Sequence, residues 1–371
     1  MSGARAAPDR ATTVSIGIPV HNGENFLAEA IDSVLAQTFD DLELIISDNA
    51  STDGTRAICE GYAARDPRVR YVRNPCNLGA AANYNRTFAL ARGRYFKWLA
   101  HDDRLEPTFL ERTVAVMEAR PEVLLCGSRV RVIDEDGVPI GTYGSIMGEA
   151  DVPSPARRFR VYVLRPHTGV DIFSLMRRSA LESSLLHAHF HGADRALLAQ
   201  LALRGPMVQL PETLNEIREH AQRYTRRARS ARLRRDWHGQ VPGGCANIPI
   251  LGLYQTYRRV VAEAALSADD RRRCRAALLR WWLVNWNAVR VAVDIAAVAM
   301  PGIVGFAESM KERLVGAPVG HIRPPRGRPG EKRREASAFG AQACESLLSA
   351  DSAALQHPAG PATRVPRSFS S

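Results

Sequence analysis

The first half of the chain alternates between two hydrophobic periodicities. Every second residue is apolar and branched from Val14 to Val20, which is the pattern of a buried strand. The following segment, 25–39, repeats apolar residues at the spacing of a helix that packs through one face. Further strands are predicted at 42–48, 69–74, 95–100 and 123–133, and further helices at 51–66, 79–93 and 107–121. This order predicts an α/β fold built on a doubly wound, mostly parallel sheet.

Polar residues gather where the predicted strands end. The first four strands run into the sequences PVHNGEN, SDNASTDGT, NPCNLG and AHDD. In a doubly wound sheet the ligand crevice lies outside the carboxyl ends of the strands. These ends therefore predict a crevice lined by carboxylates and other hydrogen-bonding groups.

The second half of the chain is less regular. Segment 134–178 shows no clear period, and a helix at 193–205 and a strand at 207–220 follow it. Residues 246–315 have a helical pattern, but charged residues within 280–300 make that run a poor membrane span. We therefore predict a flexible N-terminus at 1–12, an α/β domain at 13–225, a basic helical extension at 226–320 and a disordered tail at 321–371.

Charge is distributed unevenly between these parts. Residues 1–220 contain 25 Lys and Arg against 28 Asp and Glu, a net charge of −3. Residues 221–371 contain 25 against 11, a net charge of +14. The C-terminal part is therefore expected to meet an anionic partner, either nucleic acid or an acidic membrane surface.

The start of the chain and its cysteines favour a cytoplasmic location. The segment MSGARAAPDRATT is polar and lacks the apolar core of a signal peptide. The six cysteines are scattered and form no C-x-x-C pair. We expect reduced thiols and no structural zinc site.

The adjacent carboxylates of Asp102 and Asp103 are the strongest candidates for chemistry. Like charges in contact repel, so the pair needs a compensating cation or a solvated position. Carboxylate oxygens suit Mg²⁺ or Mn²⁺, although the same acids could cap the helix that begins near Pro107. The chain contains neither a G-x-G-x-x-G turn nor a P-loop, which removes the main support for dehydrogenases and ATPases.

The histidines of HAHFH are a weaker candidate. If the segment is extended, His187, His189 and His191 share one face, a spacing that could bind zinc. We favour the alternative in which they line the edge of a substrate pocket.

Three segments together resemble the family 2 glycosyltransferases: VSIGIPVHNGENFLAEAIDSVLAQTFDDLELIISDNASTDGT, NPCNLGAAANYNRTFALARGRYFKWLAHDDRLEP and GADRALLAQLALRG. The resemblance covers residues 13–225. It implies a GT-A fold, a nucleoside-diphosphate-sugar donor, a divalent Mg²⁺ or Mn²⁺, a sugar or lipid-linked acceptor, and inversion at the anomeric carbon. Polysaccharide or glycolipid assembly is the setting that it implies. The basic C-terminal part, and not the resemblance, is the reason to expect a peripheral position on the inner face of the cell membrane.

The resemblance also assigns nucleotide-sugar-binding residues. They are Pro19, Val20, His21, Asn22 and Glu24 in the turn against the nucleoside, Asp48 at the base, Asn77 at the third strand end, and Asp102 near the ribose and diphosphate. His21 stands where relatives more often have Tyr, and Asn49 and Ala50 replace the usual Asp and Gly.

The same resemblance assigns the metal and the catalytic base. Asp103 matches the direct metal ligand, and His220 matches a histidine that often completes the metal or diphosphate site. Asp194 matches the base that removes the acceptor proton. Ala100 stands where many relatives have Asp, so the metal site is expected to depend more on the diphosphate.

Two other functions remain as alternatives. A sugar-phosphate nucleotidyltransferase also uses an α/β sheet with acidic metal ligands, but HNGENF lacks the Gly-rich basic loop usual after its first strand. A basic nucleic-acid-binding protein would explain the net charge of +11. The positive charge, however, lies outside the α/β part, and the acidic crevice would repel phosphates, so no nucleic acid is expected.

Overall fold

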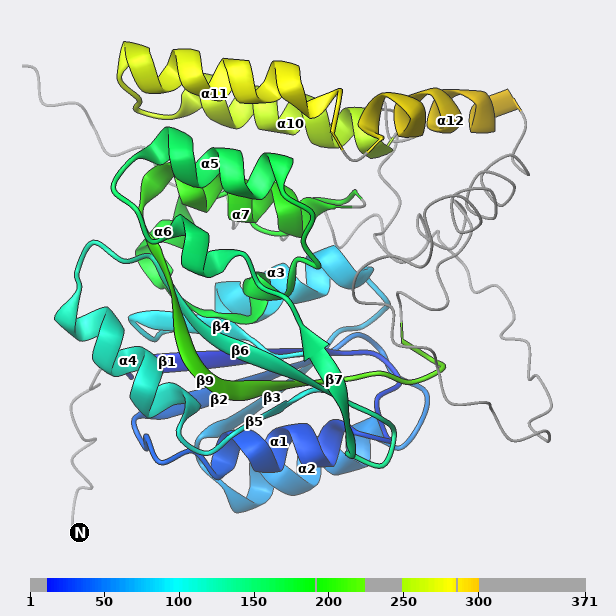
Figure 1. Cartoon of the computed structure of the whole chain (residues 1–371). Helices are drawn as coiled ribbons and strands as arrows, with labels where there is room; N and C mark the ends of the chain where they lie inside the picture. Colours follow the sequence, from blue (N-terminus) through cyan, green and yellow to red (C-terminus); the bar gives the residue numbers. More distant parts are fainter. Residues whose placement is uncertain (1–11, 191, 224–248, 285, 300–371) are drawn as a thin grey trace, which may run out of the picture. The chain divides into compact units, whose positions relative to one another are not determined.

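The computed structural model describes residues 12–190, 192–223, 249–284 and 286–299 (Figure 1). The predicted alternation of strands and helices is confirmed over the first half of the chain. Its elements are β1 (Val14–Val20), α1 (Leu27–Leu35), β2 (Leu42–Asp48), α2 (Thr55–Arg65), β3 (Val69–Arg73), α3 (Ala80–Leu90), β4 (Tyr95–Trp98), β5 (Arg104–Leu105), α4 (Phe109–Ala119) and β6 (Leu125–Ile133).

Segment 134–178, which shows no clear period, contains several short elements. They are β7 (Pro139–Tyr143), η1 (Met147–Ala150), α5 (Pro155–Leu164), η2 (Val170–Phe173) and β8 (Leu175–Arg177), followed by α6 (Arg178–Glu182), α7 (Ala193–Arg204) and β9 (Met207–Arg218). Helix α5 has a start signal that the sequence reading passed over. Ser154 accepts a hydrogen bond from the backbone N–H of Arg157, and Pro155 occupies the first turn.

One mixed sheet joins the strands in the order β3-β2-β1-β4-β8-β6-β9-β5, with β7 beside β6. The first four strands of this order are parallel, and β6 and β9 are also parallel. Strand β8 is antiparallel to both neighbours and joins the two parallel groups. Val20 at the end of β1 is paired with Asp48 at the end of β2, and Asp48 with Arg73 at the end of β3. The polar strand ends therefore lie side by side, as predicted.

Hydrophobic layers cover both faces of the sheet (Figure 1). On one face, Ile16 and Ile18 of β1 pack with Ile31 of α1 and Phe109 of α4. On the other face, the residues of α3, α5 and α7 surround Trp98 at the end of β4. Burying these apolar surfaces is the main contribution that stabilises the fold.

The C-terminal helices pack on this second layer (Figure 1). Helix α10 (Pro249–Glu263) contacts α7, α11 (Ala268–Trp281) contacts α5, and α12 (Asn287–Ala299) follows. Tyr257 and Trp281 are buried in the same core as α5 and α7. The helical pattern predicted for 246–315 is confirmed where the structure describes it, and α11 and α12 are separated near Trp286, whose φ is 59°.

Several predictions fall partly or wholly on undescribed residues. The flexible N-terminus, the domain boundary at 225 and the tail at 321–371 lie largely outside the described ranges. Among the helices that the structure describes, none has an apolar run long enough to cross a membrane. Cys59, Cys126 and Cys274 are free buried thiols, as expected, whereas Cys76 is disulfide-bonded and departs from the expectation of reduced cysteines.

Candidate active site at the carboxyl ends of the strands

The turn after β1 is hydrogen-bonded to the loop after β2. Asn22, whose φ is 55°, accepts through Oδ1 from the backbone N–H of Thr52 at 2.8 Å. Glu24 accepts through Oε2 from the backbone N–H of Gly54 at 2.7 Å. Asparagine tolerates the left-handed conformation because its short polar side chain can hydrogen-bond locally. The predicted residues Asn22 and Glu24 thus hold one rim of the crevice in shape.

His21 connects this rim to the third strand end. Its Nδ1 lies 3.0 Å from the carbonyl oxygen of Asn49, and its Nε2 lies 3.3 Å from Nδ2 of Asn77. Both His21 and Asn77 are exposed, whereas Pro19 and Val20 are buried in β1. Of these four predicted residues, His21 and Asn77 present side chains to solvent, and the other two shape the backbone.

Both carboxylate oxygens of Asp48 accept hydrogen bonds from other groups of the protein. Its Oδ1 accepts from the backbone N–H of Ser51 at 2.8 Å, and its Oδ2 accepts from the hydroxyl of Tyr71 at 2.8 Å and from Arg73 at 2.5 Å. Burial by itself would raise the pKa of Asp48, but these donors outweigh it and lower the pKa. A buried carboxylate whose two oxygens both accept hydrogen bonds holds the surrounding loop in one conformation. The predicted contact of Asp48 with a base stays a prediction.

Asp102 and Asp103 lie directly after β4 and are both buried, with 8% and 3% of their surface exposed. Asp102 Oδ2 is 2.8 Å from Nε2 of His220, so the structure joins these two predicted residues. Asp103 Oδ1 accepts from the backbone N–H of Arg218 at 2.9 Å. Burial and the neighbouring Asp102 raise the pKa of Asp103 to about 8. The pair is therefore held together at an electrostatic cost, as adjacent buried carboxylates must be.

Arg223 is a cation of this site that the sequence reading missed. Its guanidinium donates to Glu219 and, at 3.2 Å, to the hydroxyl of Tyr143. Burial by itself would lower the pKa of Arg223, but Asp103 and the other nearby acids raise it.

Lys97 is a second buried cation near Asp103. It lies in the middle of β4, is fully buried, and donates through Nζ to the carbonyl oxygen of Phe173. Burial lowers the pKa of Lys97 to about 7, while the charge of Asp103 acts in the opposite direction. A lysine inside the apolar run YFKWLA was the sequence signal for this residue, since lysine is rarely buried without a partner.

The segment that carries Asp102 and Asp103 lies next to the turn after β1. The ring of Phe26, just after the turn, packs edge-on against His220 with 4.9 Å between centroids. A Cβ at Gly23 would lie 2.6 Å from the ring of His101, so the turn approaches the acids as closely as glycine permits. The residues assigned to the nucleoside and to the diphosphate thus share one rim.

Asp194 lies in the first turn of α7, partly exposed, and burial raises its pKa. Gly169, with a φ of 78°, lies directly against its carboxylate: a Cβ at Gly169 would come 2.5 Å from Asp194 Oδ2. The loop before η2 therefore accommodates Asp194 only because residue 169 has no side chain. The sequence reading did not single out this glycine.

The hydroxyl of Tyr84 is influenced by the charges of both the paired acids and Asp194. Burial raises the pKa of its hydroxyl, and Asp102, Asp103 and Asp194 all act in the same direction. All three carboxylates are therefore close enough to influence one side chain. The structure brings the predicted base to the same end of the sheet as the predicted metal ligands.

The HAHFH segment adds an aromatic contact to this group. The ring of His187 lies 4.7 Å from the ring centroids of both Tyr84 and Trp98. Asn85 holds its backbone through two hydrogen bonds of 2.9 Å: Oδ1 of Asn85 accepts from the N–H of His187, and Nδ2 of Asn85 donates to the carbonyl oxygen of His187. His191 lies outside the described residues. Packing of His187 against aromatic rings favours the pocket edge over zinc as the role of this segment.

The acids fit a divalent cation that takes further ligands from a substrate. Within the described part of the chain, no three His, Cys, Asp or Glu residues form a complete metal site. The hydrogen bonds of Asp102 and Asp103 to described residues use one oxygen of each, which leaves the other oxygen for a cation. Mg²⁺ and Mn²⁺ prefer such oxygen donors, and Mg²⁺ commonly binds one or two carboxylates together with substrate phosphates.

Several known proteins are similar to this chain. Residues 15–185 match the family described as Glycosyl transferase family 2. An uncharacterized protein of Mycobacterium tuberculosis is 31% identical over 204 residues, which cover 54% of this chain and 57% of that protein. A putative glycosyltransferase of Bacillus subtilis, EpsE, is 38% identical over 126 residues, 34% of this chain and 45% of the relative. The chain thus spans about half the length of these relatives.

A solved structure shares the fold. It is that of Staphylococcus aureus TarS, residues 1–349, in complex with UDP-GlcNAc, with a TM-score of 0.53 and 16% identity over 73% of this chain and 72% of that one. At this identity the likeness shows the fold alone. The family match ends before Asp194 and His220, so it does not cover them and their predicted roles stay predictions.

Proposed function

We propose that the protein moves a sugar from a nucleoside-diphosphate donor to an acceptor hydroxyl with inversion. The match of residues 15–185 to Glycosyl transferase family 2 and the fold shared with a solved structure support this proposal, in line with the predicted GT-A fold. The observation that carries the proposal is the buried pair Asp102–Asp103 at the end of β4, closed by His220 and flanked by the polar turn after β1. Polysaccharide or glycolipid assembly is the proposed setting.

The nucleotide would bind along the rim formed by the first three strand ends. His21 and Asn77 are the exposed polar groups there, and Asp48 and Glu24 keep the loops in position. The diphosphate would then lie beside Asp102, Asp103 and His220. When bound, Mg²⁺ or Mn²⁺ would neutralise the charge of the diphosphate at these residues.

Asp194 supplies the proton acceptor in this mechanism. The acceptor hydroxyl attacks the anomeric carbon on the face opposite the diphosphate, the bond to the diphosphate oxygen breaks, and Asp194 takes the hydroxyl proton. A carboxylate whose pKa is raised by burial accepts a proton more readily than an ordinary aspartate. Arg223, which stays charged between the acids and Tyr143, is placed to stabilise the leaving diphosphate.

A panel of donors tests the proposal. The full chain is incubated with UDP-, GDP- and dTDP-sugars, with and without Mn²⁺, and release of nucleoside diphosphate is followed together with thermal shifts. A glycosyltransferase releases the diphosphate from at least one donor. A nucleotidyltransferase would instead release pyrophosphate from a nucleoside triphosphate and a sugar phosphate, and that result would replace the proposal.

Gly169 should be required for the position of the base. Changing Gly169 to Ala would force a Cβ to 2.5 Å from Asp194 Oδ2 and strain a φ of 78°, so Asp194 must move. We expect transfer to fall by about tenfold to a hundredfold, because small displacements of a reacting group are costly. Donor affinity, measured by calorimetry, should not change.

Gly137 provides a matched control. Its φ of 81° imposes the same backbone strain on alanine, but the nearest atoms are the flexible end of Arg104, at 3.0 Å. Gly137→Ala should lower the melting temperature about as much as Gly169→Ala and leave transfer unchanged. Equal loss of transfer in both variants would mean that general destabilisation, not displacement of Asp194, explains the effect.

The C-terminal helices should dock on an acidic membrane surface. Five of the six exposed large hydrophobic side chains in the described residues lie here: Leu279, Leu283, Trp286, Val289 and Ile295. They stand among arginines in a chain segment with a net charge of +14, and each basic residue near anionic lipid contributes about 1 kcal/mol. Cosedimentation with vesicles of anionic phospholipid should therefore be strong and should fall steeply with added salt.

Substitutions that keep the whole chain test this surface. Leu279→Glu and Leu283→Glu alter side chains that are 71% and 86% exposed, so folding should tolerate them. Both variants should bind the vesicles less tightly. Val138→Glu, at a side chain 55% exposed on the β6–β7 turn, is the control and should bind like the parent. Equal binding by all three variants would contradict the assignment.

A further inference from the structure

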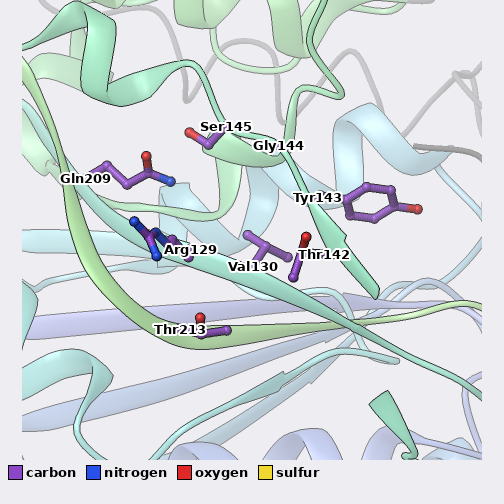
Figure 2. A pocket seen from close by; sticks show the side chains of 8 residues that line it. All are labelled: Arg129, Val130, Thr142, Tyr143, Gly144, Ser145, Gln209 and Thr213. Atoms are coloured by element: carbon purple, nitrogen blue, oxygen red, sulfur yellow. The ribbon is translucent and has the colours of Figure 1, made fainter. Parts of the chain in front are cut away.

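A second concavity opens between β6, β7 and β9 (Figure 2). Its volume is about 400 Å³. Figure 2 shows the side chains that line it, of which the polar ones are Arg129, Thr142, Tyr143, Ser145, Gln209 and Thr213. A concave site with several convergent polar groups is typical of a binding pocket for a polar ligand.

An irregularity in the pairing of β6 with β9 creates this pocket. Gly127 of β6 is paired with Gln209 of β9, and the next pair along the strands is Arg129 with Thr213. Between these two pairs, β6 advances by two residues and β9 by four. The extra length of β9 includes Pro211, which has no N–H to donate to the ladder. Bulges of this kind redirect side chains and often occur next to active sites. Here Arg129 and Thr213 line the opened stretch.

Arg129 is the one charged residue of the lining. Among the residues that the structure describes, no acid forms an ion pair with it and no acidic side chain lines the pocket. Its neighbour on the strand, Arg131, is by contrast paired with both Glu106 and Glu216. A guanidinium binds carboxylate or phosphate through two parallel hydrogen bonds. Arg129 is exposed and shares the lining with hydroxyl and amide groups, and its charge suits an anionic ligand.

Asp171 lies behind the pocket, and its carboxylate already accepts hydrogen bonds from two hydroxyl groups of the protein. Asp171 accepts from the hydroxyl of Ser145 at 2.6 Å and from the hydroxyl of Tyr162 at 3.0 Å. It is buried behind the lining residue Ser145, and its two carboxylate oxygens each accept one of these hydroxyl hydrogen bonds. Asp171 therefore orients Ser145 and is not itself part of the lining.

Two hydrogen bonds link lining residues of the pocket to segments of the candidate active site. Through Ser145 it contacts Asp171 of η2, the short helix that begins directly after Gly169, which lies against Asp194. Through Tyr143 it contacts Glu219, the residue before His220. A ligand in the pocket would therefore lie near the proposed base and away from the nucleoside rim, which is the side from which an acceptor must approach.

We propose that this pocket binds an anionic group, a carboxylate or a phosphate, on the acceptor saccharide, and that Arg129 receives that group. The proposal rests on glycosyl transfer as the function of the neighbouring site. It makes the acceptor an acidic saccharide and makes Arg129 a residue that determines acceptor specificity. The hydroxyls of Thr142 and Thr213 and the amide of Gln209 would hydrogen-bond the sugar ring.

The test compares two probes that differ only at C6, methyl β-D-glucuronide with a carboxylate there and methyl β-D-glucoside with a neutral hydroxymethyl group. Their binding to the full chain saturated with a nucleoside diphosphate is measured by saturation-transfer NMR. We expect the glucuronide to bind about tenfold more tightly, since hydrogen bonds to a charged group contribute that much or more. Glucose 6-phosphate is a third probe, and its binding relative to the glucuronide shows which anion the pocket prefers.

Substitution of Arg129 should remove and then reverse the preference. Arg129→Gln should bind the two methyl glycosides equally, and Arg129→Glu should instead favour the cationic methyl β-D-glucosaminide. Arg157→Gln is the matched control, because Arg157 is an exposed arginine of α5 away from the pocket, and it should behave like the parent. Equal binding of the charged and neutral probes to the parent, no detectable glucuronide binding, or an unchanged preference in Arg129→Gln would each overturn the proposal.

Donor turnover on the same preparations separates this proposal from the function on which it rests. If a nucleotide sugar is consumed but the preference is absent, the anionic pocket fails and glycosyl transfer stands. If the preference is present and depends on Arg129 but no donor is bound or consumed, glycosyl transfer fails.

Discussion

Asp194→Asn should abolish most sugar transfer while leaving donor binding intact. Asparagine keeps the size of the side chain, so it still fits against Gly169, but it cannot accept the acceptor proton. A positioned general base contributes about 10²–10⁴-fold, and we expect a loss of that size in the transfer rate. Donor affinity should change by less than about 1 kcal/mol, because the contribution of the base appears only in the transition state. Calorimetry and a transfer assay on one preparation measure both quantities.

The pH dependence adds a second readout for Asp194. Transfer requires the deprotonated carboxylate, so the rate should fall as the pH drops through the pKa of Asp194, which burial raises above its ordinary value. The acid limb of the profile should disappear in Asp194→Asn. Asp136→Asn, at an exposed aspartate of the β6–β7 turn, is the control and should keep the parent profile. Transfer within a few-fold of the parent in Asp194→Asn would remove the assignment.

Asp103→Asn should lose metal-dependent donor binding without losing stability. Asn can still accept the hydrogen bond from the backbone of Arg218, but it no longer offers an anionic oxygen to a cation. It also removes one of two buried carboxylates that repel each other, so the melting temperature without metal should stay the same or rise. Loss of function combined with retained stability is the expected signature of a functional acid.

Asp102→Asn distinguishes the two acids. Asp102 is held by His220 at 2.8 Å, so its substitution should weaken donor binding and also disturb His220. Calorimetry with a nucleotide sugar, with and without Mn²⁺, measures both variants, and Asp40→Asn at an exposed position is the control. If Asp102→Asn alone loses the response to Mn²⁺, the direct ligand is Asp102, and the assignment to Asp103 is wrong.

The sequence predicted the core of the fold because its signal is local. Alternating and helical periodicities identified the elements from β1 to β6 other than the two-residue strand β5, and strand ends of parallel neighbours necessarily lie on one edge of a sheet. Where elements are short, the periodicity is too brief to read, which is why β7, α5 and β8 were missed within 134–178.

Tertiary structure decided which residues act together. His220 joins Asp102 across more than a hundred residues of chain, and nothing in the local pattern around either residue encodes that contact. Gly169 and Arg223 became visible only as neighbours of Asp194 and Asp103, because closeness in space between distant segments depends on how the whole sheet is assembled.

By itself, then, the sequence determined the α/β elements, the polar strand ends and the family resemblance, all of which are properties of contiguous segments. The structure alone decided that Asp48 is saturated by internal donors, that a bulge at Pro211 opens a pocket, and that Arg129 faces it without an acidic partner among the described residues. These features arise from pairing register and burial, which depend on contacts between segments far apart in the chain.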